Sequence, residues 1–159
     1  LGWQRRTRSE ESDVEVWAEI VGRADENATL ASRYLLFMIS AGIIAGIGDG
    51  EIDAVTSAEV IQEILHRFLS LRRPEVGRLQ ATKAMDLFAP VLPITHALMR
   101  RVPDLAAKYP TLAARDLVHV ATCIYEGITD VISPDKGFDQ VTEIRRIDPR
   151  DFASIDDPA

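Results

Sequence analysis

The sequence predicts an α/β fold with a mainly parallel sheet. Over roughly the last hundred residues, short apolar stretches alternate with longer segments of helical period. This alternation is typical of strands joined by helical crossovers. A length of 159 residues fits one domain and is enough to bury a core, and no internal repeat or low-complexity stretch interrupts the pattern.

The strands are predicted from short apolar stretches after Gly50. The second of them contains Pro90 and Pro93, which have no N–H to give to a β-ladder, so we place it at the edge of the sheet. The predicted strands are Ile52–Thr56, Ala89–Ile94, Asp130–Ser133 and one within Val141–Ile147.

The helices are predicted from cap residues and apolar periodicity. In order, they are a helix capped by Ser57 that runs to about Leu71, a helix from Pro74 to about Asp86, a helix capped by Thr95 and interrupted at Pro103, and a helix from Leu112 to Glu126 that ends at Gly127. The expected apolar faces are Val60, Ile61, Ile64, Leu65, Phe68 and Leu69 on the first, and Leu117, Val118, Ala121, Ile124 and Tyr125 on the last.

The first fifty residues have a different character. Ser12–Glu15 has capping-box spacing, and Val14, Trp17 and Val21 then recur on one helical face. Tyr34–Gly48 carries no charge, but its fifteen residues fall short of the roughly 20 that span a membrane. We expect a buried helix there, with a cut-off membrane segment and a strand plus turn as the alternatives.

Composition restricts the function. A net charge of -7 argues against a protein that holds nucleic acid through its overall charge, so a nuclease would need local basic groups. The single Cys123 excludes a disulfide framework and favours a reducing, cytoplasmic setting. Phosphate-binding glycine loops and zinc-ligand spacings are not found. The basic groups, each of which is also explained as a solvated helix face, are Arg67, Arg72, Arg73 and Arg78, then Arg100 and Arg101, then Arg145 and Arg146.

Three carboxylates lie near the ends of predicted elements. Asp116 is in the first turn of a helix, Asp135 follows a strand, and Glu63 lies about two turns into the helix after the first strand. Parallel strands bring their carboxyl ends to one edge of a sheet, where these side chains are expected to meet. Carboxylate oxygens are suitable ligands for Mg²⁺ or Mn²⁺, and such a cation offsets their repulsion and activates water for phosphodiester hydrolysis.

Each carboxylate also has a purely structural interpretation. Glu63 falls on the polar face of its helix, and Glu59 occupies a similar face one turn earlier. Asp116 stabilises a helix N-terminus. Asp135, within Ser-Pro-Asp-Lys-Gly, is a normal turn residue.

The same residues resemble the PIN-domain family, especially its VapC-type toxins, over about Gly50–Phe152. Val-Thr-Ser-Ala-Glu-Val-Ile-Gln-Glu-Ile resembles the segment with the family's second acidic ligand, here Glu63. Ala-Arg-Asp-Leu-Val-His-Val-Ala-Thr resembles the segment with the third, here Asp116. Val-Ile-Ser-Pro-Asp-Lys-Gly-Phe-Asp resembles the segment with the fourth, here Asp135, and Asp139 matches a further acidic position.

The resemblance implies a three-layer α/β/α fold and cleavage of RNA with Mg²⁺ or Mn²⁺. It implies that Glu63, Asp116 and Asp135 are catalytic and that these three and Asp139 hold the metal. It also implies a homodimer and an antitoxin protein that blocks the site.

The chain departs from the family at its start. The family opens with an apolar strand that ends in Asp-Thr-Asn or a near variant, and no such motif precedes Asp49. Asp13 follows Ser-Glu-Glu-Ser, and Leu35–Ile39 is followed by Ser40, so the role of first ligand is transferred to neither Asp13 nor Ser40. We therefore predict an atypical N-terminal segment (1–49), a PIN-like domain (50–152) and a tail (153–159).

Alternatives remain for both the origin of this N-terminal segment and the function of the chain. A gene fusion, rearrangement or truncation would explain the atypical start, as would a fragment that begins at Leu1 rather than at Met. The alternative function is a catalytically impaired PIN-like remnant that dimerises or binds the antitoxin. A weaker hypothesis is membrane association through Tyr34–Gly48.

Overall fold

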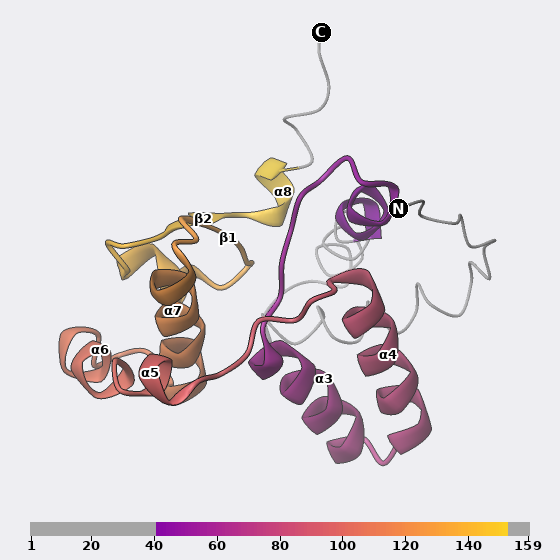
Figure 1. Ribbon diagram of the computed structural model, residues 1–159, viewed down its shortest axis with the longest axis horizontal. Coiled ribbons are helices and arrows are strands. Elements are labelled where there is room, and N and C mark those ends of the chain that lie inside the picture. The colour runs from indigo at the N-terminus through magenta and orange to yellow at the C-terminus, as the bar shows by residue number, and fades with distance from the viewer. Residues whose placement is uncertain (1–40, 153–159) are drawn as a thin grey trace, which may run out of the picture.

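A computed structural model describes residues 41–152 of the chain (Figure 1). Residues 41–49 are helical. They are followed by the elements α3 (Ala58–Ser70), α4 (Pro74–Leu87), α5 (His96–Met99), α6 (Val102–Lys108), α7 (Ala114–Glu126), β1 (Asp130–Ile132), the 3-10 helix η1 (Lys136–Gln140), β2 (Arg145–Ile147) and α8 (Pro149–Phe152). The predicted capping box at Ser12–Glu15, residues 34–40 and the tail 153–159 lie outside the described residues.

The predicted helices after Gly50 are confirmed with small shifts of their ends. α3 follows Ser57, α4 begins at Pro74, and α7 ends where Gly127 takes the left-handed conformation with φ 71°. The Thr95 hydroxyl accepts a hydrogen bond from the Leu98 amide at 3.2 Å, which caps α5 as predicted. By contrast, the Ser57 side chain forms no capping bond, although its residue occupies the N-cap position.

The sheet is parallel, as predicted, but smaller. β1 and β2 pair in parallel, with Asp130 opposite Arg145 and Ile132 opposite Ile147. The predicted strands Ile52–Thr56 and Ala89–Ile94 are wrong, because they contribute a single isolated bridge between Ser57 and Leu92.

Proline chemistry explains why that bridge does not extend. The Leu92 amide donates to the Thr56 carbonyl at 2.8 Å, and the Leu92 carbonyl accepts from the Ala58 amide at 2.9 Å. The preceding residue whose N–H would face the same partner is Pro90, which has no N–H to offer the ladder. The chain on the other side enters α3 directly after the bridge.

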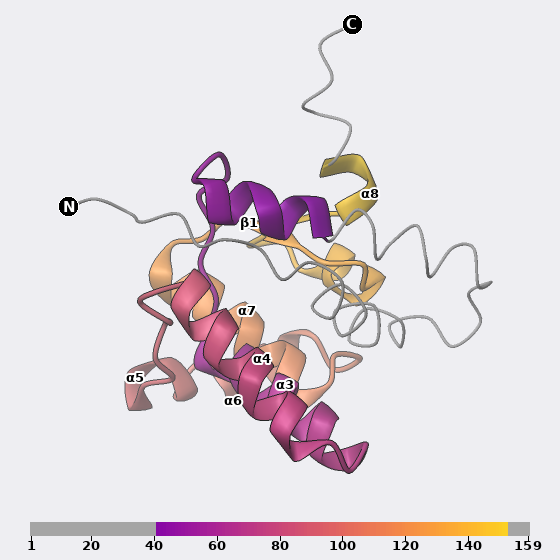
Figure 2. The ribbon, with the colours of Figure 1, turned by 90° about the vertical axis from the view of Figure 1, so that its right-hand side faces the viewer.

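Helix α7 lies at the centre of the described part (Figure 1). The hairpin of α3 and α4 lies on one side of it, α5 and α6 on the other, and the two-stranded sheet at one end. Figure 2 shows residues 41–49 and α8 near that same end, away from the turn that joins α3 to α4. Residues 41–48 confirm the helix expected in Tyr34–Gly48, and Ile43 within it is buried. No helix in the described residues is long and apolar enough to cross a membrane.

The core has two clusters. The smaller one joins α3 to α4, and its buried members are Ile61, Ile64, Phe68, Ala81 and Ala84. The larger one surrounds α7, and its buried members are Leu98, Leu105, Tyr109, Leu117, Val118, Val120, Ala121, Phe138, Val141 and Ile144. The predicted apolar faces were too wide, since Leu69 is 60% exposed and Tyr125 is 43% exposed. A single neighbouring helix covers only a narrow stripe of α3.

Helices α3 and α4 pack closely where Gly77 meets Phe68. A Cβ atom placed on Gly77 would lie 2.7 Å from the Phe68 Cβ, which is too close for two carbon atoms. The Phe68 Cβ is fixed to the backbone and cannot turn aside, so the helices themselves would have to separate. The absence of a side chain at Gly77 therefore sets the distance between α3 and α4.

Gly77→Ala is expected to destabilise the fold. Overpacking costs about 1–3 kcal/mol, and the better helix propensity of alanine returns only about 1 kcal/mol. The net loss should lower Tm by about 4 °C in a thermal melt. Gly42→Ala is the matched control, because Gly42 is also helical but has no atom within 4 Å of an added Cβ. A Gly77→Ala melt at or above the wild-type Tm would contradict the close-packing argument.

Candidate active site

Asp116 lies at the start of the buried helix α7. The preceding N-cap position is Ala113, whose side chain has no hydrogen-bond acceptor. Asp116 compensates in part, since its Oδ2 accepts from the Ala113 amide at 3.3 Å. The side chain is only 19% exposed. Burial raises the pKa of the Asp116 carboxyl above its usual value, and the negative charge of Asp135 raises that pKa further.

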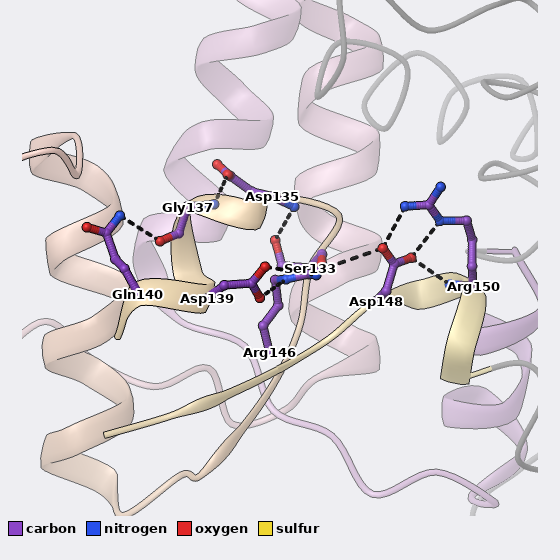
Figure 3. A network of polar contacts seen from close by, with 8 residues as sticks. All are labelled: Ser133, Asp135, Gly137, Asp139, Gln140, Arg146, Asp148 and Arg150. Atoms are coloured by element: carbon purple, nitrogen blue, oxygen red, sulfur yellow. Dashed lines mark hydrogen bonds and ion pairs between the residues drawn. The ribbon is translucent and has the colours of Figure 1, made fainter. Parts of the chain in front are cut away.

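Asp135 is held in a turn that follows β1. Its amide donates to the Ser133 hydroxyl at 3.1 Å, and its Oδ1 accepts from the Gly137 amide at 2.7 Å, which caps η1 (Figure 3). These local bonds confirm the turn that the Ser-Pro-Asp-Lys-Gly segment predicted. They fix the backbone at Asp135 and leave its second carboxylate oxygen without a hydrogen-bond donor among the described residues.

Glu63 comes from α3 and faces α7. Its Oε2 lies 3.4 Å from His119 Nε2, and its Oε1 lies 3.5 Å from Arg115 Nε. The contact with His119 is the main cause of a lowered Glu63 pKa, and Arg115 lowers that pKa further against the opposing effect of burial. Arg115 Nε is also 3.9 Å from Asp116 Oδ1, so it stands between two of the predicted site residues.

Asp139 has a different partner. Both of its oxygens accept from Arg146, at 2.6 Å from Nε and 3.3 Å from the second terminal nitrogen (Figure 3). The Asp139 carboxylate is therefore already neutralised by a two-point ion pair, the strongest type of hydrogen-bonded pair that arginine makes.

The four predicted residues thus fall into three environments. Asp116 and Asp135 are close enough for one charge to raise the other's pKa, Glu63 is paired with His119 and Arg115, and Asp139 is paired with Arg146. Across residues 41–152 no group of three or more His, Cys, Asp or Glu side chains is arranged to hold a metal ion. The chemistry of the donors fits a hard cation best at Asp116 and Asp135, where negative charge is least compensated.

The basic partners Arg115 and Arg146 were missed as site residues from the sequence. Arg115 and His119 are four residues apart on α7 and so share a face, which the sequence indicates, but their pairing with Glu63 depends on how α3 packs against α7. Arg146 stood out only as one of two adjacent arginines. Its partner is fixed by the pairing of β1 with β2, which no local pattern reveals.

A comparison with protein families matches residues 13–144 to the PIN domain. The chain belongs to the PIN domain family. Its fold is therefore the three-layer α/β/α fold that the resemblance implied, with the helices and the parallel sheet described above. The match begins at Asp13, well before Gly50, where the sequence motifs placed the start of the resemblance.

Individual relatives are similar to this chain over much of their length. It is 37% identical over 93 residues to a VapC ribonuclease of Mycobacterium bovis and to the ribonuclease VapC13 of Mycobacterium tuberculosis, covering 58% of this chain and 71% of each relative. It is 30% identical over 113 residues to the ribonuclease VapC7 of Mycobacterium tuberculosis, covering 67% of this chain and 74% of that relative. No solved structure matches the chain significantly.

Asp116→Asn is expected to stabilise the protein in the absence of metal. Because the folded-state pKa of Asp116 is raised, the ionised carboxylate costs stability at neutral pH. The asparagine removes that cost and can still accept from the Ala113 amide. In thermal melts with EDTA at pH 7, Tm should rise by about 2 °C. The gain should shrink as the pH falls through the Asp116 pKa, where the wild-type carboxyl is itself neutral.

The matched control is Asp104→Asn. Asp104 is also an acidic residue in a first helical turn, that of α6, and it is exposed. There the substitution removes only a favourable interaction with the helix dipole, so Tm should stay level or fall slightly. A lower Tm for Asp116→Asn than for Asp104→Asn at pH 7 would contradict the destabilising effect of the ionised, partly buried Asp116 carboxylate.

Proposed function

We propose that this chain is an endoribonuclease of the VapC toxin type that hydrolyses RNA phosphodiester bonds with a bound Mg²⁺ or Mn²⁺. The observation that carries the proposal is that the partly buried Asp116 carboxyl, whose pKa burial raises, also feels the negative charge of Asp135, which comes from a separate element 19 positions later in the chain. Uncompensated carboxylates that face one another are a recurring feature of catalytic and metal sites. Family membership and the ribonuclease relatives support the same conclusion.

In this proposal the cation is held by Asp116 and Asp135, with Glu63 as the third carboxylate and Asp139 at the edge of the site. When bound, the cation polarises a phosphoryl oxygen and lowers the pKa of a coordinated water. Glu63 must then exchange its contacts with His119 and Arg115 for the cation. Arg115 is 64% exposed, so once released it is free to turn outward and contact an RNA phosphate.

The partners we propose are RNA, a cognate antitoxin protein and a second copy of the chain. The net charge of -7 means that RNA must be bound through local cations rather than the overall field, and Arg115 lies beside the carboxylates. Light scattering of the purified protein tests the homodimer, and a monomer at micromolar concentration would contradict it. A cytoplasmic location is proposed because its reducing conditions suit a single Cys123.

The impaired-remnant alternative rested on the missing opening Asp. The family match now reaches back to Asp13, so the N-terminal segment is itself part of the match. We therefore favour the active enzyme and include Asp13→Asn in the activity assay, since Asp13 stands where the matched region opens. The division into an N-terminal segment (1–49), a PIN-like domain (50–152) and a tail (153–159) stays a prediction.

The test is cleavage of a mixed RNA substrate by the wild type and by Asp116→Asn. Loss of a metal ligand should reduce the rate by more than the roughly 10–100-fold that outer-shell partners cost. EDTA should abolish cleavage, and Asp104→Asn should retain it. Equal rates for the wild type and Asp116→Asn, in a preparation freed of contaminating nuclease, would overturn the assignment. A folded wild type that cleaves nothing but captures an antitoxin peptide would favour the remnant.

The choice of metal gives a second prediction. With Glu63 and Asp139 engaged by basic side chains, the free protein offers few unpaired oxygens, and metal binding should be weak. Mn²⁺ binds such sites more tightly than Mg²⁺. At limiting metal concentration, we therefore expect faster RNA cleavage with Mn²⁺ than with Mg²⁺. Equal rates under those conditions would contradict this account.

A further inference from the structure

Arg146, in the three-residue strand β2, uses its guanidinium to contact three different residues, Ser133, Asp139 and Asp148. Its side chain is only 11% exposed. Besides the two bonds to Asp139, one terminal nitrogen donates to the Ser133 carbonyl at 2.9 Å and reaches Asp148 Oδ2 at 3.3 Å (Figure 3). The guanidinium is thus held on three sides.

Two of these partners, Ser133 and Asp139, lie on either side of Asp135 in the sequence. Ser133 and Asp139 are the first and last residues of the segment that carries it, and Arg146 binds both. Within the segment, Asp135 binds the Ser133 hydroxyl through its amide and the Gly137 amide through its carboxylate. Arg146 therefore joins the two ends of this segment, and Asp135 between them is held by its hydrogen bonds to Ser133 and Gly137 (Figure 3).

The Ser133–Asp139 segment and Arg146 are each held by further contacts. Phe138, next to Asp139, is buried in the larger core cluster and so fixes the segment to the core. Asp148 holds Arg146 from the opposite side and is itself bound by the Arg150 side chain at 2.6 and 2.8 Å. The two arginines and the two aspartates balance in charge, so Arg146 and Asp148 can be buried without leaving an unpaired ion.

We propose that Arg146 is a positioning residue that fixes the Ser133–Asp139 segment and so holds the Asp135 carboxylate opposite Asp116. The inference deepens the proposed function and rests on it for its catalytic consequence. It also assigns Asp139 a role, which is to hold Arg146. Only arginine suits this position, because its planar fork reaches a carboxylate with two nitrogens and a carbonyl with a third.

Arg145 provides a matched comparison within the same strand. It also binds a carboxylate with two nitrogens, to Asp130 at 2.8 and 2.7 Å. Its side chain is 71% exposed, however, and neither it nor Asp130 touches the Ser133–Asp139 segment in any contact the structure describes. The two arginines share residue type, strand and pairing geometry, and differ in what they hold.

The experiment compares Arg146→Lys and Arg146→Gln with Arg145→Gln in the full chain. The first readout is amide hydrogen exchange at Asp135 and Gly137, whose N–H groups are hydrogen-bonded within the Ser133–Asp139 segment. Both Arg146 variants should exchange faster there by about 10-fold or more, while amides within α7 keep their protection. The second readout is Mn²⁺ affinity by calorimetry, which should fall about 10-fold or more for Arg146→Lys. Arg145→Gln should match the wild type in both.

The outcomes separate the inference from the proposed function. If Arg146→Lys and Arg145→Gln show the same exchange at Asp135 and Gly137, the positioning role is wrong. If the exchange at these amides rises but Mn²⁺ affinity is unchanged, Arg146 only stabilises the turn, and the inference fails. If the wild type binds no Mn²⁺ and cleaves no RNA, the proposed function fails, and the exchange data still decide whether Arg146 holds Asp135. Should Arg146→Gln not fold, the lysine variant, which keeps the positive charge, gives the answer.

Discussion

The burial of helix α7 is the constraint on which the rest of the described structure depends. Most of this helix is buried, yet its first turn carries the charged side chain of Asp116. Its inner side, including Val120 and Ala121, is fully buried in the larger core cluster. Asp116 lies one turn before Val120 on the same helix, so the packing of α7 also leaves Asp116 partly buried. The core therefore fixes Asp116 in space, at an energetic cost seen in its raised pKa.

The charges around α7 shift the pKa values of Glu63 and Asp116 in opposite directions. Glu63 is offset by His119 and Arg115, and its pKa is lowered, whereas the pKa of Asp116 is raised by its burial and by Asp135. The negative charge of Glu63 is thus compensated more fully than that of Asp116, to which Arg115 makes only a long contact of 3.9 Å. A cation gains most where compensation is weakest, so the electrostatics favour Asp116 and Asp135, two of the four carboxylates that the family motifs selected. These are independent arguments, since one uses spacing along the chain and the other uses distances in space.

Local features of the sequence predicted the helices well and the sheet poorly. Proline at the start of α4 and Gly127 after α7 act through their own backbone preferences, so nearby residues suffice to place those ends. A β-ladder needs a partner distant in sequence, and Ile52–Thr56 found only the single bridge at Ser57. The site follows the same rule. Motifs identified the segments that carry the acidic residues, whereas the pairing of Asp139 with Arg146 depends on how β2 lies beside β1.

The register of this short ladder is what gives two adjacent arginines different roles. Side chains alternate between the faces of a strand, so Arg145 and Arg146 must point to opposite sides. Backbone bonds at both ends of the ladder fix the register, from the Arg145 amide to Thr129 and from the Ser133 amide to Ile147. A shift by one residue would turn Arg145 toward the Asp135 segment and Arg146 away from it. Because the register rests on backbone bonds, the side chain of Arg145 can be changed without moving that of Arg146. Any difference between variants of the two residues therefore reflects their different partners, Asp130 for Arg145 and the Ser133–Asp139 segment for Arg146.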